Sequence, residues 1–157
     1  MSNKQPGSKF CFICGRQNPI SLKLEFFSPA PGEVRTNLNV SEHYQGYPGV
    51  VHGGVIAAIL DETGGRAHMT DPSKFMVTAQ LNVRYRKPIP TGKFLVARGF
   101  AGEKRGRVSH AHSEIVNEDG EVLAEAELVL VDLPESQLAE MDVEALGWQV
   151  YPDKEAI

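Results

Sequence analysis

The sequence contains no hydrophobic run long enough to cross a membrane. None of its 157 residues lie in an apolar stretch that approaches the ~18–20 residues of a transmembrane helix. The N-terminal residues, MSNKQPGSKF, lack the apolar core of a secretory signal peptide, so we do not expect secretion. Internal repeats and low-complexity tracts are also missing, which favours an ordinary globular protein.

An excess of positive charge is missing as well. Lys and Arg together number 16 against 20 Asp and Glu, which gives a formal net charge of −4. Nucleic-acid binding depends on basic residues that neutralise phosphates, so we do not expect a nucleic acid as a partner. The length and the 41% hydrophobic content indicate one domain with its own core.

Cysteine is scarce, and both residues, Cys11 and Cys14, lie in one C-x-x-C motif. A zinc site needs two more ligands, and no second C-x-x-C or H-x-x-x-H supplies them, so we predict no metal site. The surrounding FCFICGRQNP does not resemble the strand-to-helix setting of a thioredoxin-like redox pair. We favour a structural role, with zinc shared between chains and redox chemistry as the alternatives. The lack of other cysteines predicts a reducing, cytoplasmic location.

Hydrophobic periodicity divides the chain into three parts. We predict a flexible tail over residues 1–10, a single domain over 11–132, and an acidic extension over 133–157 that begins with a short helix in PESQLAEM. Within the domain, residues 53–68 form an apolar, proline-free segment that predicts a buried helix.

Alternating apolar and polar residues predict the strands. A hairpin is expected over 22–28 and 33–40, followed after the helix by four long strands over 75–86, 93–102, 106–117 and 121–132. Long antiparallel strands twist strongly. The predicted fold class is therefore α+β, with a long antiparallel sheet wrapped around one central helix.

A glycine-rich turn leads directly into the predicted helix. Gly53 and Gly54 place N–H groups without intrahelical partners at the end of a helix that carries partial positive charge. Because these residues have no side chain, a substrate atom can approach closely, which suits a carbonyl oxygen that becomes negative during a reaction. The segment lacks both the Lys-Ser/Thr of a phosphate-binding loop and G-x-G-x-x-G, so nucleotide binding is not predicted.

Asp61 follows the apolar run VIAAIL inside the same predicted helix. A carboxylate there must be hydrogen-bonded, near solvent or functional. Eight residues separate Asp61 from Gly53, about 12 Å along a helix. A catalytic carboxylate and the oxyanion donors must both lie within about 3 Å of one reacting group. If both act, two copies of the chain must build the site together, as a two-fold dimer allows.

The segments VHGGVIAAILDETGG and MVTAQLNVRYRKPIPTG resemble the hotdog-fold thioesterase superfamily, in particular the PaaI-like acyl-CoA thioesterases. In that family H-G-G opens the central helix and an Asp follows nine positions after the His, as His52 and Asp61 do here. The family's strand pattern T-x-x-L-x-V-x-Y-x-x-P is matched by Thr78, Leu81, Val83, Tyr85 and Pro88. The opening CFICG and NPISLKL also resemble many members, so the resemblance covers residues 11–132.

The resemblance implies a hotdog fold and a homodimer with the two sheets joined edge to edge, often as a dimer of dimers. It implies thioester hydrolysis at the dimer interface, without a cofactor beyond the coenzyme A of the acyl-CoA substrate. Asp61 would be the nucleophile or the general base, the Gly53 N–H would polarise the thioester carbonyl, and His52 would orient it. Thr78, which alternation places on one polar face with Gln80 and Asn82, would position the water or Asp61.

Other residues are candidates for substrate binding. Many family members carry an Asn six positions before the His; Gly46 stands there in this chain, and we expect Gln45 to take its place. Cations are needed near the phosphates of coenzyme A. The remaining binding candidates are Gly54, Asn82, Arg84, Lys104, Arg105 and Arg107, with Arg86 and Lys87 as competitors for the same role. The group Lys104, Arg105 and Arg107 is also consistent with a solvated turn.

Two other functions are compatible with the same fold. A non-catalytic acyl-CoA binding or sensing protein would not need Asp61 and Thr78, so their presence argues against it. An acyl-thioester hydratase pairs an Asp with a His a few residues away. The first His after Asp61 is His68, seven positions on, which disfavours the hydratase.

Overall fold

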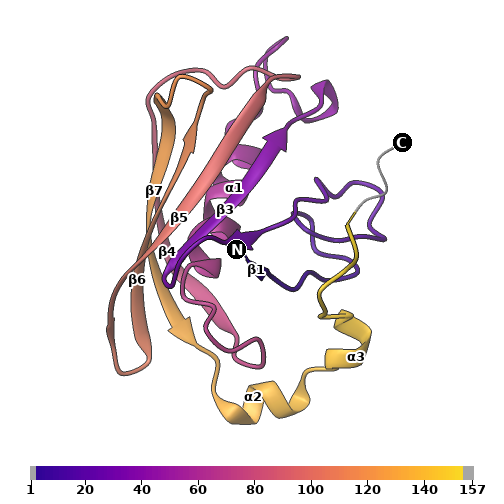
Figure 1. Ribbon diagram of the computed structural model, residues 1–157, viewed down its shortest axis with the longest axis vertical. Coiled ribbons are helices and arrows are strands. Elements are labelled where there is room, and N and C mark those ends of the chain that lie inside the picture. The colour runs from indigo at the N-terminus through magenta and orange to yellow at the C-terminus, as the bar shows by residue number, and fades with distance from the viewer. Residues whose placement is uncertain (1–2, 154–157) are drawn as a thin grey trace.

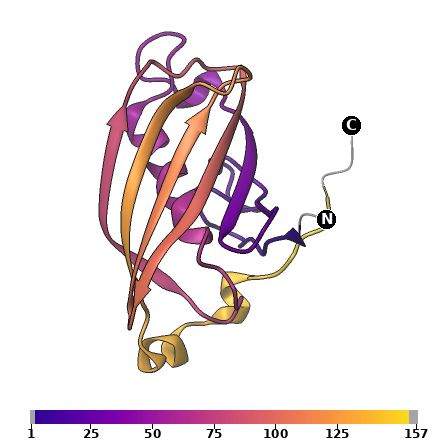
Figure 2. The same cartoon turned by 60° about the vertical axis from the view of Figure 1, so that its left-hand side comes forward.

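One antiparallel sheet curves around a single long helix in the computed structural model, which describes residues 3–153 (Figures 1 and 2). The strands are β1 (Asn3–Lys4), β2 (Phe27–Ser28), β3 (Glu33–Asn39), β4 (Met76–Tyr85), β5 (Phe94–Arg105), β6 (Val108–Val116) and β7 (Val122–Asp132). They form one seven-stranded sheet in the order β1-β2-β3-β5-β6-β7-β4. The helices are the 3-10 turn η1 (Glu42–Tyr44), α1 (Gly53–Arg66), α2 (Glu135–Glu140) and α3 (Val143–Leu146).

The helix α1 packs on the inner face of the sheet and forms the core with it. Ile59 and Leu60 of α1 are fully buried, as is Leu128 of β7. The helix and β5 approach each other closely at Gly99, where a Cβ atom would lie 2.5 Å from the Thr63 carbonyl oxygen. The predicted α+β fold, a long sheet around one helix, is confirmed.

The N-terminal segment differs most from the sequence-based expectation. Instead of forming a flexible tail, residues 3–4 pair with β2, and Gln5 and Ser8 are buried; residues 1–2 lie outside the described part. The strand predicted over 22–28 is reduced to Phe27–Ser28. Lys23 has a left-handed φ of 52°, which interrupts an extended conformation.

The remaining boundaries lie close to the predicted ones. The central helix ends at Arg66 rather than 68, and α2 lies within the predicted PESQLAEM segment. The C-terminal segment passes beneath the end of α1 (Figure 1). There the Trp148 indole donates to the Pro72 carbonyl at 2.9 Å and its ring lies 5.3 Å from the Arg66 guanidinium. No helix within residues 3–153 combines the length and apolar character of a membrane span.

Strand β4 contains an irregularity that changes which side chains face the helix. Its register with β7 shifts between Thr78 and Gln80, so Ala79 forms a bulge. Before the bulge, the Thr78 hydroxyl reaches Asp61 on α1. After it, Leu81 and Val83 pack against the core.

The predicted common face for Thr78, Gln80 and Asn82 is therefore wrong. Asn82 lies opposite Glu127 of β7, which is exposed on the outer face of the sheet. Directly opposed residues project to the same side of a sheet, so Asn82 projects away from α1. Strict alternation fails here because one extra residue in a bulge exchanges the two faces.

Replacing Gly99 by Ala is expected to destabilise the domain by about 1–3 kcal/mol, because the added Cβ would overpack the contact between α1 and β5. It would lie 2.5 Å from the Thr63 carbonyl oxygen and 2.7 Å from the Val34 side chain. Gly65→Ala is the matched control, since its Cβ would meet only Leu130 at 3.9 Å. Ala favours a helix over Gly by about 0.8–1 kcal/mol. Urea unfolding measures the free energy of unfolding of both variants. A Gly99→Ala chain as stable as the wild type would contradict the close contact.

Candidate functional site

The N-terminus of α1 is capped by an imidazole. His52 is the N-cap residue, and its Nδ1 accepts a hydrogen bond from the Gly54 N–H at 2.9 Å. The Gly54 N–H, a candidate substrate contact, is thus engaged within the protein. The Gly53 N–H has no acceptor among the described residues, because it belongs to the first helical turn, where intrahelical partners are missing.

The cap also defines how His52 presents its ring. A neutral imidazole has one acceptor nitrogen and one N–H donor. Because Nδ1 accepts from Gly54, the neutral ring carries its proton on Nε2. The His52 backbone N–H donates to the Tyr44 carbonyl at 2.9 Å, which anchors the backbone of His52 to the preceding loop. In its neutral form, His52 therefore keeps an Nε2–H donor on the N-cap residue of α1.

A cleft of about 700 Å³ opens at this end of α1, a size within the usual range for small-molecule sites of about 300–1,000 Å³. His52 and Gly53 line it together with apolar Ile56 and Ile89. Tyr85 of β4 also lines it, and its hydroxyl donates to the Gly53 carbonyl at 2.7 Å. In the sequence, Tyr85 stands out only as part of the family pattern, because its contact with the helix start depends on the register of β4.

Gln45 does not line this cleft. Its side-chain oxygen accepts from the Gly49 N–H at 3.1 Å, so the amide is turned toward its own loop. Gly46 does line the cleft, and a Cβ there would lie 3.4 Å from the His52 Cα. In this conformation the loop lines the cleft with Gly46, Tyr47 and Val50 rather than with the predicted Gln45 side chain.

Asp61 and Thr78 form a second group at a distance from the cleft. The Thr78 hydroxyl donates to Asp61 Oδ1 at 2.6 Å, which leaves Oδ2 without that bond. Neither residue lines the cleft. Eight residues of α1 separate Asp61 from Gly53, a rise of about 12 Å. The structure thus brings Asp61 and Thr78 together and keeps both away from His52 and Gly53 of the same chain.

The predicted basic contacts are distributed over two places. Lys104 pairs with Asp132 at 2.9 Å, Arg105 pairs with Glu103 at 2.8 Å, and Arg107 donates to the Asp132 carbonyl at 3.0 Å. This group lies where β4 begins, since Met76 is opposite Asp132. It is therefore at the Asp61 end of the molecule and away from the cleft of its own chain.

Arg84 and the two residues after β4 behave differently. Arg84 lies opposite Glu125, on the outer face with Asn82. Arg86 and Lys87 line the cleft. Arg86 pairs with Glu125 at 2.8 Å and Lys87 pairs with Glu121, and neither glutamate lines the cleft. These cations lower the pKa of both glutamates through hydrogen bonds to their carboxylates. Of the basic candidates, Arg86 and Lys87 are the ones at the cleft.

Comparison with known proteins shows which family the region of this site resembles. A sequence profile of the thioesterase superfamily matches residues 48–124, which include the helix start, Asp61 and Thr78. The acyl-coenzyme A thioesterase THEM4 of Rattus norvegicus is 37% identical over 98 residues, covering 62% of this chain and 42% of that protein. The chain therefore matches less than half the length of this relative.

Solved structures show the same fold. The thioesterase superfamily protein RHA08564 is 31% identical with a TM-score of 0.71, over 78% of this chain and 60% of that one. The PaaI protein of E. coli, from the phenylacetic acid degradation operon, has a TM-score of 0.65 at 16% identity, over 72% of this chain and 81% of that one. The chain is therefore similar to the thioesterase superfamily over residues 48–124, and its architecture is the hotdog fold of these solved structures.

Proposed function

We propose that the chain is an acyl-CoA thioesterase that hydrolyses its substrate to a free acid and coenzyme A at sites formed between two copies. The observation that carries this proposal is the arrangement of α1: an unengaged Gly53 N–H in an apolar cleft at one end, and the Asp61 carboxylate bonded to Thr78 toward the other. The activity named for the THEM4 relative supports the same chemistry.

The edge strand β4 supplies a means of joining two copies. It ends the sheet beside β7, and Val77 and Tyr85 on it are 47% and 51% exposed. An uncovered edge strand offers unpaired backbone groups to another chain. Two-fold antiparallel pairing about the middle of β4 would set Thr78 of one copy opposite Val83 of the other, two residues from Tyr85 and its contact with Gly53. Each Asp61 would then face the cleft of the other copy. A dimer of dimers stays a prediction.

In this assembly the reaction needs no group beyond the two chains and water. Through the oxygen that Thr78 leaves free, Asp61 of one copy takes a proton from water, and the water oxygen attacks the thioester carbon. Alternatively, the carboxylate attacks that carbon itself, and water then hydrolyses the resulting Asp61–acyl anhydride to release the free acid. The Gly53 N–H and the His52 Nε2–H of the other copy bind the carbonyl oxygen as it becomes negative. The carbon–sulfur bond then breaks, and the coenzyme A thiolate leaves and takes up a proton.

The proposed dimer also suggests which part of acyl-CoA each binding candidate would contact. The apolar lining at Ile56 and Ile89 suits an acyl group, and Arg86 and Lys87 lie at the cleft to meet the phosphates of coenzyme A. The group Lys104, Arg105 and Arg107 lies at the sheet end that would adjoin the other copy's cleft. A cytoplasmic location stays a prediction.

Asp61→Asn is expected to lower kcat by about 100-fold or more, because general-base catalysis contributes factors of that order. The Asn oxygen can still accept from Thr78, so binding of acyl-CoA should be retained. Release of free thiol from several acyl-CoAs measures turnover, and calorimetry measures binding. Asp119→Asn, in the exposed turn between β6 and β7, is the matched control. If Asp61→Asn turned over acyl-CoA as fast as the wild type, Asp61 would have no part in the mechanism. If the wild type bound acyl-CoA but hydrolysed none, the protein would be a sensor.

Gly53→Pro tests the oxyanion donor without disturbing the helix. Proline lacks the N–H but is favoured at the first helical position. The His52 ψ of 135° is suitable for a residue that precedes proline. We expect kcat to fall by about 10²–10³-fold. Gly53→Ala retains the N–H, and its Cβ would make an ordinary 3.5 Å contact with the Tyr85 hydroxyl. Equal activity of the Pro and Ala variants would argue against the Gly53 N–H.

Mixing two inactive variants tests whether the site is shared. If Asp61→Asn and Gly53→Pro chains are dissociated and reassociated in equal amounts, half of the dimers are mixed. Each mixed dimer has one site with both groups intact, so about one quarter of wild-type activity should return. A site within a single chain would recover no activity in the mixture. Each variant reassociated alone is the control.

A further inference from the structure

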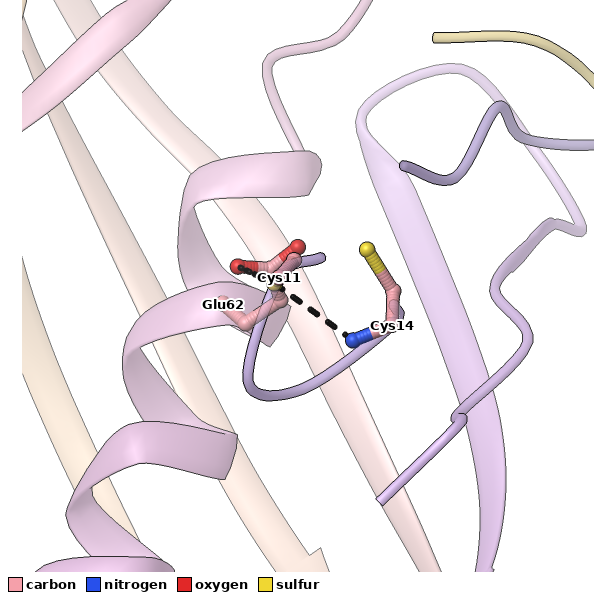
Figure 3. A group of neighbouring side chains, drawn as sticks. All are labelled: Cys11, Cys14 and Glu62. Atoms are coloured by element: carbon pink, nitrogen blue, oxygen red, sulfur yellow. Dashed lines mark hydrogen bonds between the residues drawn. The ribbon is translucent and has the colours of Figure 1, made fainter. Parts of the chain in front are cut away.

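The loop that carries the two cysteines packs against α1, and Figure 3 shows both side chains next to Glu62 of that helix. Both cysteines are free, and Cys14 is only 3% exposed. The two sulfurs and a Glu62 oxygen all lie within 4.8 Å of one another. Cys11 Sγ is 4.0 Å from Glu62 Oε2. Three potential metal ligands thus converge from segments that are far apart in the sequence.

The backbone around Cys11 is arranged to hold a sulfur ligand. The N–H groups of Ile13 and Cys14 both point to Cys11 Sγ, at 3.3 and 3.4 Å. A thiol sulfur is a weak acceptor, whereas N–H donors stabilise a thiolate. The tight loop requires Gly15, where a Cβ would lie 2.3 Å from the Cys11 carbonyl oxygen.

The carboxylate of Glu62, the third potential ligand, is oriented by the buried Arg66. Arg66 Nε donates to Glu62 Oε1 at 2.9 Å, and its guanidinium also donates to the Pro6 carbonyl at 2.8 Å. This leaves Glu62 Oε2 directed toward Cys11. Arg66 thus orients Glu62 as an outer-shell partner orients a metal ligand. Two thiolates, one carboxylate and one guanidinium carry a net charge of −2, which a divalent cation would neutralise.

We infer that Cys11, Cys14 and Glu62 bind one divalent, thiol-preferring cation such as zinc. Two sulfurs and one carboxylate oxygen are ligands that zinc accepts in tetrahedral geometry, with the fourth position open to water. Thiol protons are released when the ion binds. The ion would fasten the N-terminal segment to α1 at the residue after Asp61, independently of the proposed hydrolysis.

Cobalt is the probe, because its spectrum reports the ligands directly. The full-length, reduced chain is stripped with a chelator and titrated with Co²⁺ without oxygen. We expect saturation at one ion per chain, with thiolate-to-cobalt charge-transfer absorption and the visible bands of a tetrahedral site, both abolished by zinc. Weak, non-stoichiometric binding without charge-transfer absorption would overturn the proposal, as would a chain that forms a Cys11–Cys14 disulfide with peroxide but binds no cobalt when reduced.

Variants assign the ligands. Cys14→Ser should lower the charge-transfer absorption by at least half, because at most one thiolate ligand remains, and Glu62→Gln should weaken Co²⁺ binding by about tenfold or more. Glu127→Gln, on the outer face of the sheet, is the matched control and should bind as wild type does. Zinc should raise the melting temperature of the wild type and of Glu127→Gln but not of Cys14→Ser. An equal rise in all three, or unchanged cobalt spectra in Cys14→Ser, would refute the site.

Discussion

The burial of α1 against the curved sheet holds Gly53 and Asp61 of one rigid helix at a constant separation. Its side chains Ile59 and Leu60 are enclosed by the sheet, so the helix cannot bend to bring Asp61 toward Gly53. At about 1.5 Å per residue, no rearrangement of one helix shortens that distance. A chain that uses both groups in one reaction must therefore obtain one of them from a second copy.

The edge strand β4 connects this constraint to assembly. One bulge at Ala79 turns Thr78 toward Asp61, while the rest of the strand keeps Leu81 and Val83 in the core. The same strand ends at Tyr85, which contacts the start of α1. A single edge strand thus contacts the helix both at its start and at Asp61, and its free backbone side is the part of the sheet most suited to pairing.

Arg66 organises the opposite side of α1. Its guanidinium lies 4.3 Å from the centre of the Phe26 ring and 5.3 Å from that of Trp148, and it donates to the Pro6 carbonyl. It therefore joins the N-terminal segment, the helix and the C-terminal segment. Its bond to Glu62 places that carboxylate beside the cysteine loop. The buried Arg66 guanidinium therefore contributes both to packing and to the inferred cation site.

The sequence by itself determined the central helix, the four long strands and the sheet that surrounds the helix, because these follow from local periodicity. It also determined that Asp61 and Gly53 are too far apart for one helix to combine them. Only the tertiary structure decided that the Gly54 N–H is taken by His52, that Gln45 turns away from the cleft, and that the Thr78 hydroxyl bonds to Asp61, one of the two partners that the family resemblance implied. It alone brought Glu62 next to the cysteine pair, of which Cys11 lies 51 positions away in the sequence. Such contacts depend on a bulge, a cap or the approach of distant segments, and hydrophobic periodicity carries no information about them.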